Sequence, residues 1–126
     1  MIKRLDNIGV AVTDVRRAVA FFTEKLGLEG QAWSDDGGNV KIGDVSLFIF
    51  RTGKANTVGR TPEFSGNPVG IDHLAFEVDD LEQAIVEMEG KGVVFVHDTV
   101  GEKGKFRYRG TQDPDGNMVF VIEKPS

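Results

Sequence analysis

The sequence contains no cysteine, which excludes disulfide bonds, thiolate metal sites and thiol nucleophiles and fits a reducing compartment. It also lacks any run of lysine or arginine. Its 15 basic residues stand against 20 acidic ones, giving a formal net charge of −5. Nucleic acids and anionic membrane surfaces are bound through basic patches, so we expect neither as a partner.

No stretch approaches the ~20 consecutive apolar residues of a membrane-spanning helix. Residues 1–6 lead into a strand pattern without a secretion leader, so we expect a cytoplasmic protein. The chain has 126 residues, of which 40% are hydrophobic and 28% charged. These values are typical of one globular domain with a sizeable core.

An internal repeat is the clearest pattern in the sequence. Residues 5–25 align without a gap with residues 71–91, and Asp14 aligns with Asp80. The two copies share few identities but have the same order of apolar and polar positions. This order predicts the same local structure in both copies.

Each copy predicts a strand, then a helix, then about three further strands. The strands at 8–12 and 74–78 are rich in β-branched and aromatic residues, and an aspartate that can cap a helix follows each strand. Apolar residues at three- and four-residue spacing then predict one helix per copy. They are Val15, Ala18, Val19, Phe22 and Leu26 in the first copy, and Leu81, Ala84, Ile85 and Met88 in the second.

Turn residues divide the segments that follow the helices. We expect a hairpin at Gly37, Gly38 and Asn39, and a β-turn at residues 113–116. A connection over residues 52–70, which contains Gly, Pro and Asn, joins the two copies. One copy alone could not cover both faces of its sheet, so we expect two copies to form one domain or to pair across a dimer.

Three segments of the chain resemble the vicinal oxygen chelate (VOC) superfamily, which includes glyoxalase I, extradiol dioxygenases and bleomycin-resistance proteins. They are LDNIGVAVTDVRRAVAFFTEKLGL, IDHLAFEVDDLEQAI and DPDGNMVFVIE. The resemblance covers essentially the whole chain, and it implies a single VOC domain over residues 1–126. Module 1 would span about 1–55 and module 2 about 71–126.

The fold class implied by the resemblance is α+β. Two tandem βαβββ modules would form a cup-shaped mixed sheet, the glyoxalase/bleomycin resistance fold. Such domains usually form homodimers, and their small-molecule chemistry takes place inside the cup.

The resemblance also implies four positions at which metal enzymes of this family bind a divalent ion. Here the first-strand positions are Asn7 and His73, and the last-strand position of the second module is Phe120. The alternation along the strand selects Phe48 for the fourth position, with Ser46 as the next choice. Only His73 is a conventional ligand, and phenyl rings have no lone pair to donate. We therefore expect a lost metal site and no cofactor.

The same alternation predicts an aromatic lining of the cup, with the intervening strand residues facing the helices. These rings either line a pocket for an aromatic or otherwise apolar ligand or fill the cup as core, and both interpretations stay open. Trp33, Phe106 and Tyr108 are candidates for the rim, and packing in the core or in a subunit interface is the commoner alternative for such residues. The candidate ligand-binding residues are Asn7, Trp33, Ser46, Phe48, Phe50, His73, Tyr108, Met118 and Phe120.

Other polar residues are given simpler roles. We expect His73 to make a polar contact with a ligand or with Asn7, and we assign no catalytic residue. His97 is expected at the surface. Arg107 and Arg109 are expected on a solvated or subunit-facing edge. Glu123 has the strand parity that points away from the cup.

The leading hypothesis is a metal-independent binder of a small organic ligand. It resembles the antibiotic-resistance proteins that sequester a drug in the aromatic-lined crevice of a homodimer. The ligand would be aromatic or, given the acidic chain, cationic. The alternative is a metal-dependent lyase, isomerase or dioxygenase that uses a depleted site around His73 and Asn7. The long central connection supports a third alternative, a structural or regulatory module that binds a partner.

Overall fold

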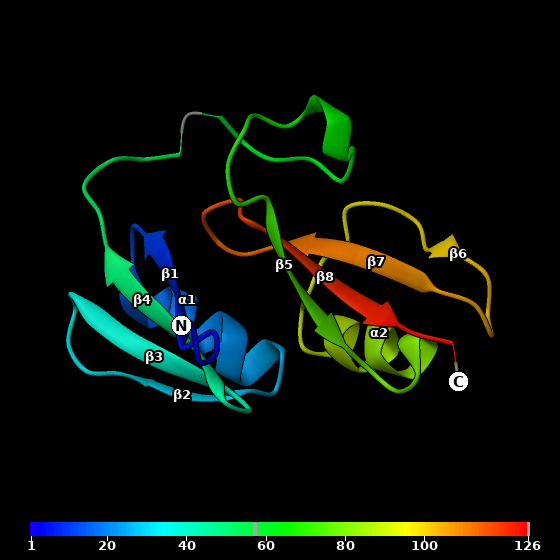
Figure 1. Cartoon of the computed structure of the whole chain (residues 1–126), viewed down its shortest axis with the longest axis horizontal. Helices are drawn as coiled ribbons and strands as arrows, with labels where there is room; N and C mark the ends of the chain where they lie inside the picture. The colour runs from blue at the N-terminus through cyan, green and yellow to red at the C-terminus, as the bar shows by residue number, and fades with distance from the viewer. Residues whose placement is uncertain (57, 126) are drawn as a thin grey trace. The chain divides into compact units, whose positions relative to one another are not determined.

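The structure is a computed structural model that describes residues 1–56 and 58–125 (Figure 1). The chain divides into two units, Met1–Ala55 and Asn56–Ser126. Each unit contains a four-stranded mixed sheet and one main helix, so the prediction of an α+β fold with two βαβββ modules is confirmed. In the described part of the chain, no helix has the length and apolar character needed to cross a membrane.

The sheet of the first unit has the order β1-β4-β3-β2, and its only parallel pair is β1 with β4. Asp14 caps the helix as predicted, because its side chain accepts the Arg17 N–H at 3.0 Å. Leu47 and Ile49 are fully buried with the apolar face of the helix. The elements are β1 (Asn7–Val12), α1 (Val15–Ala20), its π-helical continuation η1 (Phe21–Lys25), β2 (Glu29–Ala32), β3 (Gly37–Ile42) and β4 (Val45–Arg51).

The hairpin of the first unit does not lie where the glycines suggested. Residues 37–39 belong to β3, and the turn spans residues 33–36, with the Trp33 N–H donating to the Gly37 carbonyl at 2.8 Å. A Cβ at Gly38 would lie 2.6 Å from the carbonyl oxygen of Gln31 on β2. The glycine is therefore needed for the close approach of two strands, a second role that sequence alone does not separate from a turn.

The sheet of the second unit has the order β5-β8-β7-β6, again with one parallel pair, β5 with β8. Asp80 caps the helix by accepting the Gln83 N–H at 3.1 Å. The predicted turn at 113–116 is confirmed by a hydrogen bond from the Gly116 N–H to the Asp113 carbonyl. The elements are η2 (Phe64–Gly66), β5 (His73–Glu77), α2 (Leu81–Gly90), β6 (Val100–Gly101), β7 (Arg107–Gln112) and β8 (Met118–Glu123).

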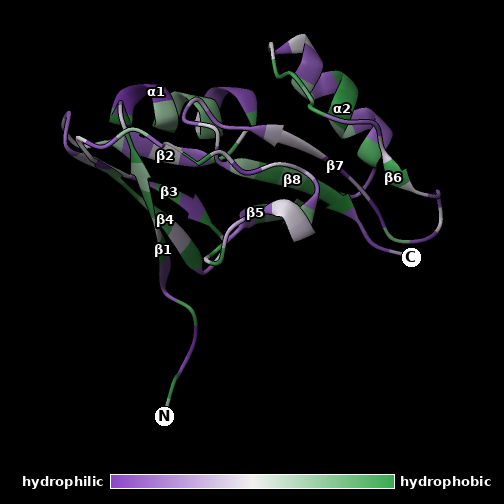
Figure 2. Cartoon of the chain, turned by 90° about the horizontal axis from the view of Figure 1, so that it is seen from above, coloured by the Kyte–Doolittle hydropathy of each residue, from purple (hydrophilic) through white to green (hydrophobic). Residues whose placement is uncertain are grey.

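The hydropathy of these elements agrees with their positions. In Figure 2, β8 is coloured as hydrophobic along most of its length, whereas α2 alternates between hydrophobic and hydrophilic residues. Four consecutive residues of β8, 118–121, are buried, as expected of a strand that is covered on both faces. The helix buries Leu81, Ile85 and Met88 and leaves its other side to solvent.

Arg107 is not on a solvated edge, and this expectation was wrong. Its side chain is 5% exposed. The guanidinium donates to both carboxylate oxygens of Glu123, at 2.7 and 3.1 Å, and to Glu82 at 3.1 Å. Glu123 also accepts the backbone N–H of Leu81 at 3.0 Å. These contacts join β7, β8 and the start of α2, and they hold Glu123 on the face predicted for it.

We expect Arg107→Met to lower the urea midpoint of unfolding clearly, whereas Lys105→Met, at an exposed position on the same segment, should change it little. The hydrogen bond from Arg107 lowers the pKa of Glu123 below its ordinary 4.5. The contribution of the Arg107–Glu123 pair to the free energy of unfolding is therefore fully present above pH 4.5. It is lost as the pH falls through the pKa of Glu123 in the folded protein. The difference in urea midpoint between wild type and Arg107→Met should therefore become smaller at acid pH. Equal midpoints at neutral pH would contradict this role for Arg107.

Candidate functional site

The strand registers place the family's metal-binding positions equivalently in the two units. In each unit, one phenylalanine lies two residues beyond the strand partner of the first-strand position, Phe48 for Asn7 and Phe120 for His73. Side chains two residues apart on a strand share a face. Each first-strand position therefore shares a face with a phenylalanine of its own unit. Ser46 lies on the same face as Phe48, but only Phe48 has the two-residue offset that Phe120 has in the second unit.

Three rings stack in the first unit, and we call Trp33, Phe48 and Phe50 the aromatic platform. The centroids of Phe48 and Phe50 are 5.4 Å apart, and those of Trp33 and Phe48 are 6.2 Å apart, with interplanar angles of 29° and 28°. Trp33 is 58% exposed and Phe48 41% exposed. The platform thus presents open aromatic surface, which is where planar ligands stack.

Carboxylates in the turn beside Trp33 are already paired. Asp35 accepts from Arg16 at 2.8 Å, and this hydrogen bond lowers the pKa of Asp35. Asp36 pairs with Arg51 at 2.7 Å. The platform therefore offers ring faces rather than unpaired negative charge from this turn.

Polar groups of the first unit lie at the start of β1 and β4. The amide of Asn7 donates to the side chain of Asp6 at 2.9 Å. Ser46 is half-buried, and its backbone N–H donates to the Asp6 carbonyl at 3.1 Å. Asn7 is thus an exposed side chain whose amide is held by its neighbour.

Phe120 lies at the centre of a second group of rings, all in the second unit, which we call the aromatic cluster. Unlike Phe48, Phe120 is only 1% exposed. The surrounding rings are those of His73, Phe64, Tyr108 and His97, with centroids 4.7, 5.5, 5.5 and 6.0 Å from that of Phe120. Phe106 extends the cluster, with its ring centroid 5.8 Å from that of Tyr108. Met118, two residues before Phe120 on β8, is also buried.

Phe64 belongs to η2 in the connection between the modules, and the sequence analysis did not identify it. Its ring contacts His73, Tyr108 and Phe120, although 47% of the residue stays exposed. A lone phenylalanine among turn residues carries no periodic signal. Its position over β8 could therefore not be found from the sequence.

His97 is half-buried against the aromatic cluster, so the expectation of a surface residue was wrong. Its Nδ1 donates to the carbonyl of Asp98 at 2.6 Å, and its Nε2 accepts the Gly110 N–H at 2.7 Å. A Cβ at Gly110 would lie 2.7 Å from the ring of Phe120 and 3.0 Å from His97 Nε2. Gly110, in the middle of β7, was the available signal, because such a glycine often marks a close approach.

His73 is held by its neighbour in the chain. Its Nδ1 lies 2.8 Å from Asp72 Oδ2. The other oxygen of Asp72 accepts from Asn67 at 2.7 Å and from Arg60 at 3.2 Å. The hydrogen bond with His73 is the main cause of a lowered pKa of Asp72. His73 therefore faces the aromatic cluster with one nitrogen already bound.

The donor set of these positions does not fit the family's divalent ion. His73 is the only conventional ligand, Asn7 has an amide oxygen, and the two phenylalanines have no lone pair. Within residues 1–56 and 58–125, no three His, Asp or Glu side chains lie close enough together to hold a metal ion. Glu123 is engaged by Arg107 on the other face of β8.

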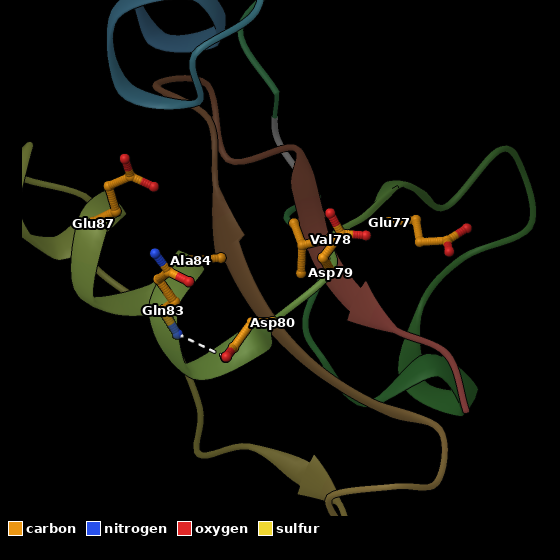
Figure 3. A pocket seen from close by; sticks show the side chains of 7 residues that line it. All are labelled: Glu77, Val78, Asp79, Asp80, Gln83, Ala84 and Glu87. Carbon is orange, nitrogen blue, oxygen red and sulfur yellow. Dashed lines mark hydrogen bonds between the residues drawn. The ribbon is translucent and has the colours of Figure 1, made fainter. Parts of the chain in front are cut away.

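The second unit also has an open hollow of about 350 Å³ between the end of β5 and α2 (Figure 3). Asp80 caps the helix there, as the dashed line in Figure 3 marks, and Glu77 pairs with Lys124 at 3.7 Å. The lining contains none of the predicted site residues. It consists of Glu77, Val78, Asp79, Asp80, Gln83, Ala84 and Glu87.

Comparison with known proteins identifies relatives over nearly the full length of the chain. The uncharacterized protein YaeR of Escherichia coli is 28% identical over 127 residues, which cover 98% of each chain. A glyoxalase/dioxygenase from Nostoc punctiforme has a similar fold, with a TM-score of 0.78 at 19% identity over 98% of this chain and 92% of that one. A glyoxalase family protein from Enterococcus faecalis gives 0.76 at 22% identity over 96% and 98%.

The family model for the Glyoxalase/Bleomycin resistance protein/Dioxygenase superfamily matches residues 4–121. This match covers the first sheet and the second as far as residue 121 of β8, with the aromatic platform and the aromatic cluster. The chain therefore belongs to the Glyoxalase/Bleomycin resistance protein/Dioxygenase superfamily.

Proposed function

We propose that this protein binds a small organic ligand without a metal ion, and that the ligand stacks on the aromatic platform. The observation that carries the proposal is the open stack of Trp33, Phe48 and Phe50. Phe48 occupies a position where metal enzymes of the family have a ligand, so a ring face replaces a coordinating group there. Planar aromatic compounds match this surface.

Charge favours neutral or cationic ligands over anionic ones. The formal net charge of −5 attracts cations at long range, and a cation can also lie over the face of an indole or phenyl ring. We extend the proposal to sequestration of a toxic compound in the cytoplasm. This is the role of the antibiotic-resistance binders that the sequence resembles.

The two phenylalanines are expected to respond differently to truncation. Phe120→Ala should cost about 3–5 kcal/mol of unfolding free energy, because it removes a fully buried ring. Phe48→Ala should cost much less, because that ring is partly exposed, but it should weaken binding of a planar ligand about tenfold. Urea unfolding measures the first effect. Quenching of Trp33, the single tryptophan, measures the second across a set of neutral and cationic planar compounds.

Val86→Ala is the matched control for both measurements, since Val86 is exposed on α2. It should leave stability and ligand binding nearly unchanged. If no planar compound quenches Trp33, or if Phe48→Ala binds as tightly as wild type, the platform is not the binding surface.

Added Ni²⁺, Zn²⁺ or Mn²⁺ should not raise the melting temperature of the purified protein. A ligand at a hundredfold excess over its Kd stabilises a native state by about 2.7 kcal/mol, so specific binding would be visible in a thermal melt. An upward shift with one metal that disappears in His73→Ala would favour the alternative, a metal-dependent lyase, isomerase or dioxygenase that uses His73 and Asn7.

We include a homodimer in the proposal. The family usually assembles in this way, and the exposed rings of the platform are apolar surface of the kind that subunits or ligands cover. Light scattering at micromolar concentration should give twice the chain mass of 13.8 kDa. A mass of one chain over the whole concentration range would show a monomer instead.

A further inference from the structure

The carboxylate of Asp72 forms hydrogen bonds with both the connection and the aromatic cluster. Its Oδ1 accepts hydrogen bonds from Asn67 at 2.7 Å and from Arg60 at 3.2 Å, both in the connection. Its Oδ2 lies 2.8 Å from Nδ1 of His73, the first residue of β5. The side chain of Asp72 is 25% exposed. One partly buried carboxylate therefore binds both the connection and His73.

The chemistry of Asp72 determines where the proton of His73 lies. An ionised carboxylate only accepts hydrogen bonds, and its three partners keep Asp72 ionised at neutral pH, with a pKa below the ordinary value. The short contact therefore requires Nδ1 of His73 to carry a proton. In the neutral imidazole, Nε2 then has a lone pair and is an acceptor.

Nε2 of His73 faces no competing polar partner, since no hydrogen bond to it occurs among residues 1–56 and 58–125. The side chain of His73 is 31% exposed, so part of the ring is open to solvent or a ligand. The ring lies edge-on to Phe120 at 4.7 Å and beside Phe64 at 5.4 Å. An acceptor beside apolar rings selects a ligand that has both an aromatic body and a donor group.

We propose that Asp72 is a positioning residue that holds His73 as the Nδ1–H tautomer, so that Nε2 accepts a hydrogen bond from an O–H or N–H group of the ligand. The ligand class would be hydroxylated or amino-substituted aromatic compounds. This step rests on the proposed function only for the chemical class of the ligand, because His73 lies in the aromatic cluster of the second unit and not on the aromatic platform of the first. The tautomer, in contrast, is a property of the free protein.

Oδ1 of Asp72 binds the segment that carries Phe64, through Arg60 and Asn67, while Oδ2 binds His73. Arg60 donates to the Pro68 carbonyl at 2.8 Å, and the Asn67 amide exchanges hydrogen bonds with the backbone of Thr61. Gln112 on β7 donates to the Arg60 carbonyl at 3.1 Å. Residues 60–68 are thus held together by hydrogen bonds among themselves and are bound to β7 through Gln112. Asp72 joins them to His73.

Nitrogen-15 NMR of the imidazole rings tests the tautomer directly. The chain has only two histidines, and the measurement is made about two pH units above the ordinary histidine pKa of ~6.5. His97 is an internal reference, because its bonds to Asp98 and Gly110 also specify the Nδ1–H form. His73→Gln assigns the two signals. Wild type should show both rings as Nδ1–H, and His73 in the Nε2–H form would overturn the proposal.

Two variants separate positioning from a merely structural role of Asp72. Asp72→Ala should shift His73 toward the Nε2–H form, which free histidine prefers, while His97 stays unchanged. Asn67→Ala removes a hydrogen bond on the side of the connection but keeps Asp72 Oδ2, so His73 should keep its tautomer. If Asp72→Ala leaves His73 as Nδ1–H, or if Asn67→Ala changes it as much, Asp72 does not position the ring.

A matched pair of probes tests the acceptor. 2-Naphthol and 2-methoxynaphthalene have the same rings, but only the first has a donor. Calorimetry with wild type should show 2-naphthol binding about three- to tenfold more tightly, and His73→Phe should remove the difference. Equal affinities in wild type would overturn the acceptor role. If neither compound binds while the tautomers are as expected, the acceptor role of His73 is overturned and the positioning role of Asp72 stands, whereas quenching of Trp33 decides the proposed function separately.

Discussion

The parallel pairing of the first and last strand of each unit is the constraint on which the site depends. This pairing puts the residue at the start of the first strand on the same face as a residue near the middle of the last strand. In the metal enzymes of the family, that shared face is where ligands meet. Here the same backbone register brings Asn7 to the face of Phe48, and His73 to the face of Phe120. In both units a phenyl ring thus occupies the face that the residue at the start of the first strand shares with the last strand.

The two units use this face differently, although their strands are related by sequence. In the first unit the rings of the aromatic platform stack on one another, and Trp33 and Phe48 remain exposed to solvent. In the second unit Phe64 and His97 close over Phe120, and Gly110 provides the space in which the ring lies. From the sequence alone, the aromatic positions could form either a pocket or a core. The structure shows Phe120 buried as core and Phe48 exposed.

Patterns of short range predicted the fold well. Capping aspartates, helical periodicity and strand alternation indicated both modules, and the alternation also placed Glu123 on the correct face. The failures arose where a residue depends on a partner far away in the chain. Arg107 is buried because its guanidinium pairs with Glu82 on α2 and Glu123 on β8, and His97 is half-buried because its Nε2 accepts the Gly110 N–H. Neither partnership has a periodic signature, and glycines such as Gly38 serve close packing as readily as turns.

The burial of Phe120 affects how this protein could be redesigned. A glutamate at position 120 would restore the carboxylate of the metal enzymes in a single step on paper. In the folded chain, however, that carboxylate would lie beneath four aromatic rings, where the loss of hydration is costly without a bound cation. Phe64, which lies in the connection between the modules, is one of these four rings. Conversion into a metalloenzyme therefore requires changes around position 120 as well as at it, and they include a residue outside the βαβββ modules.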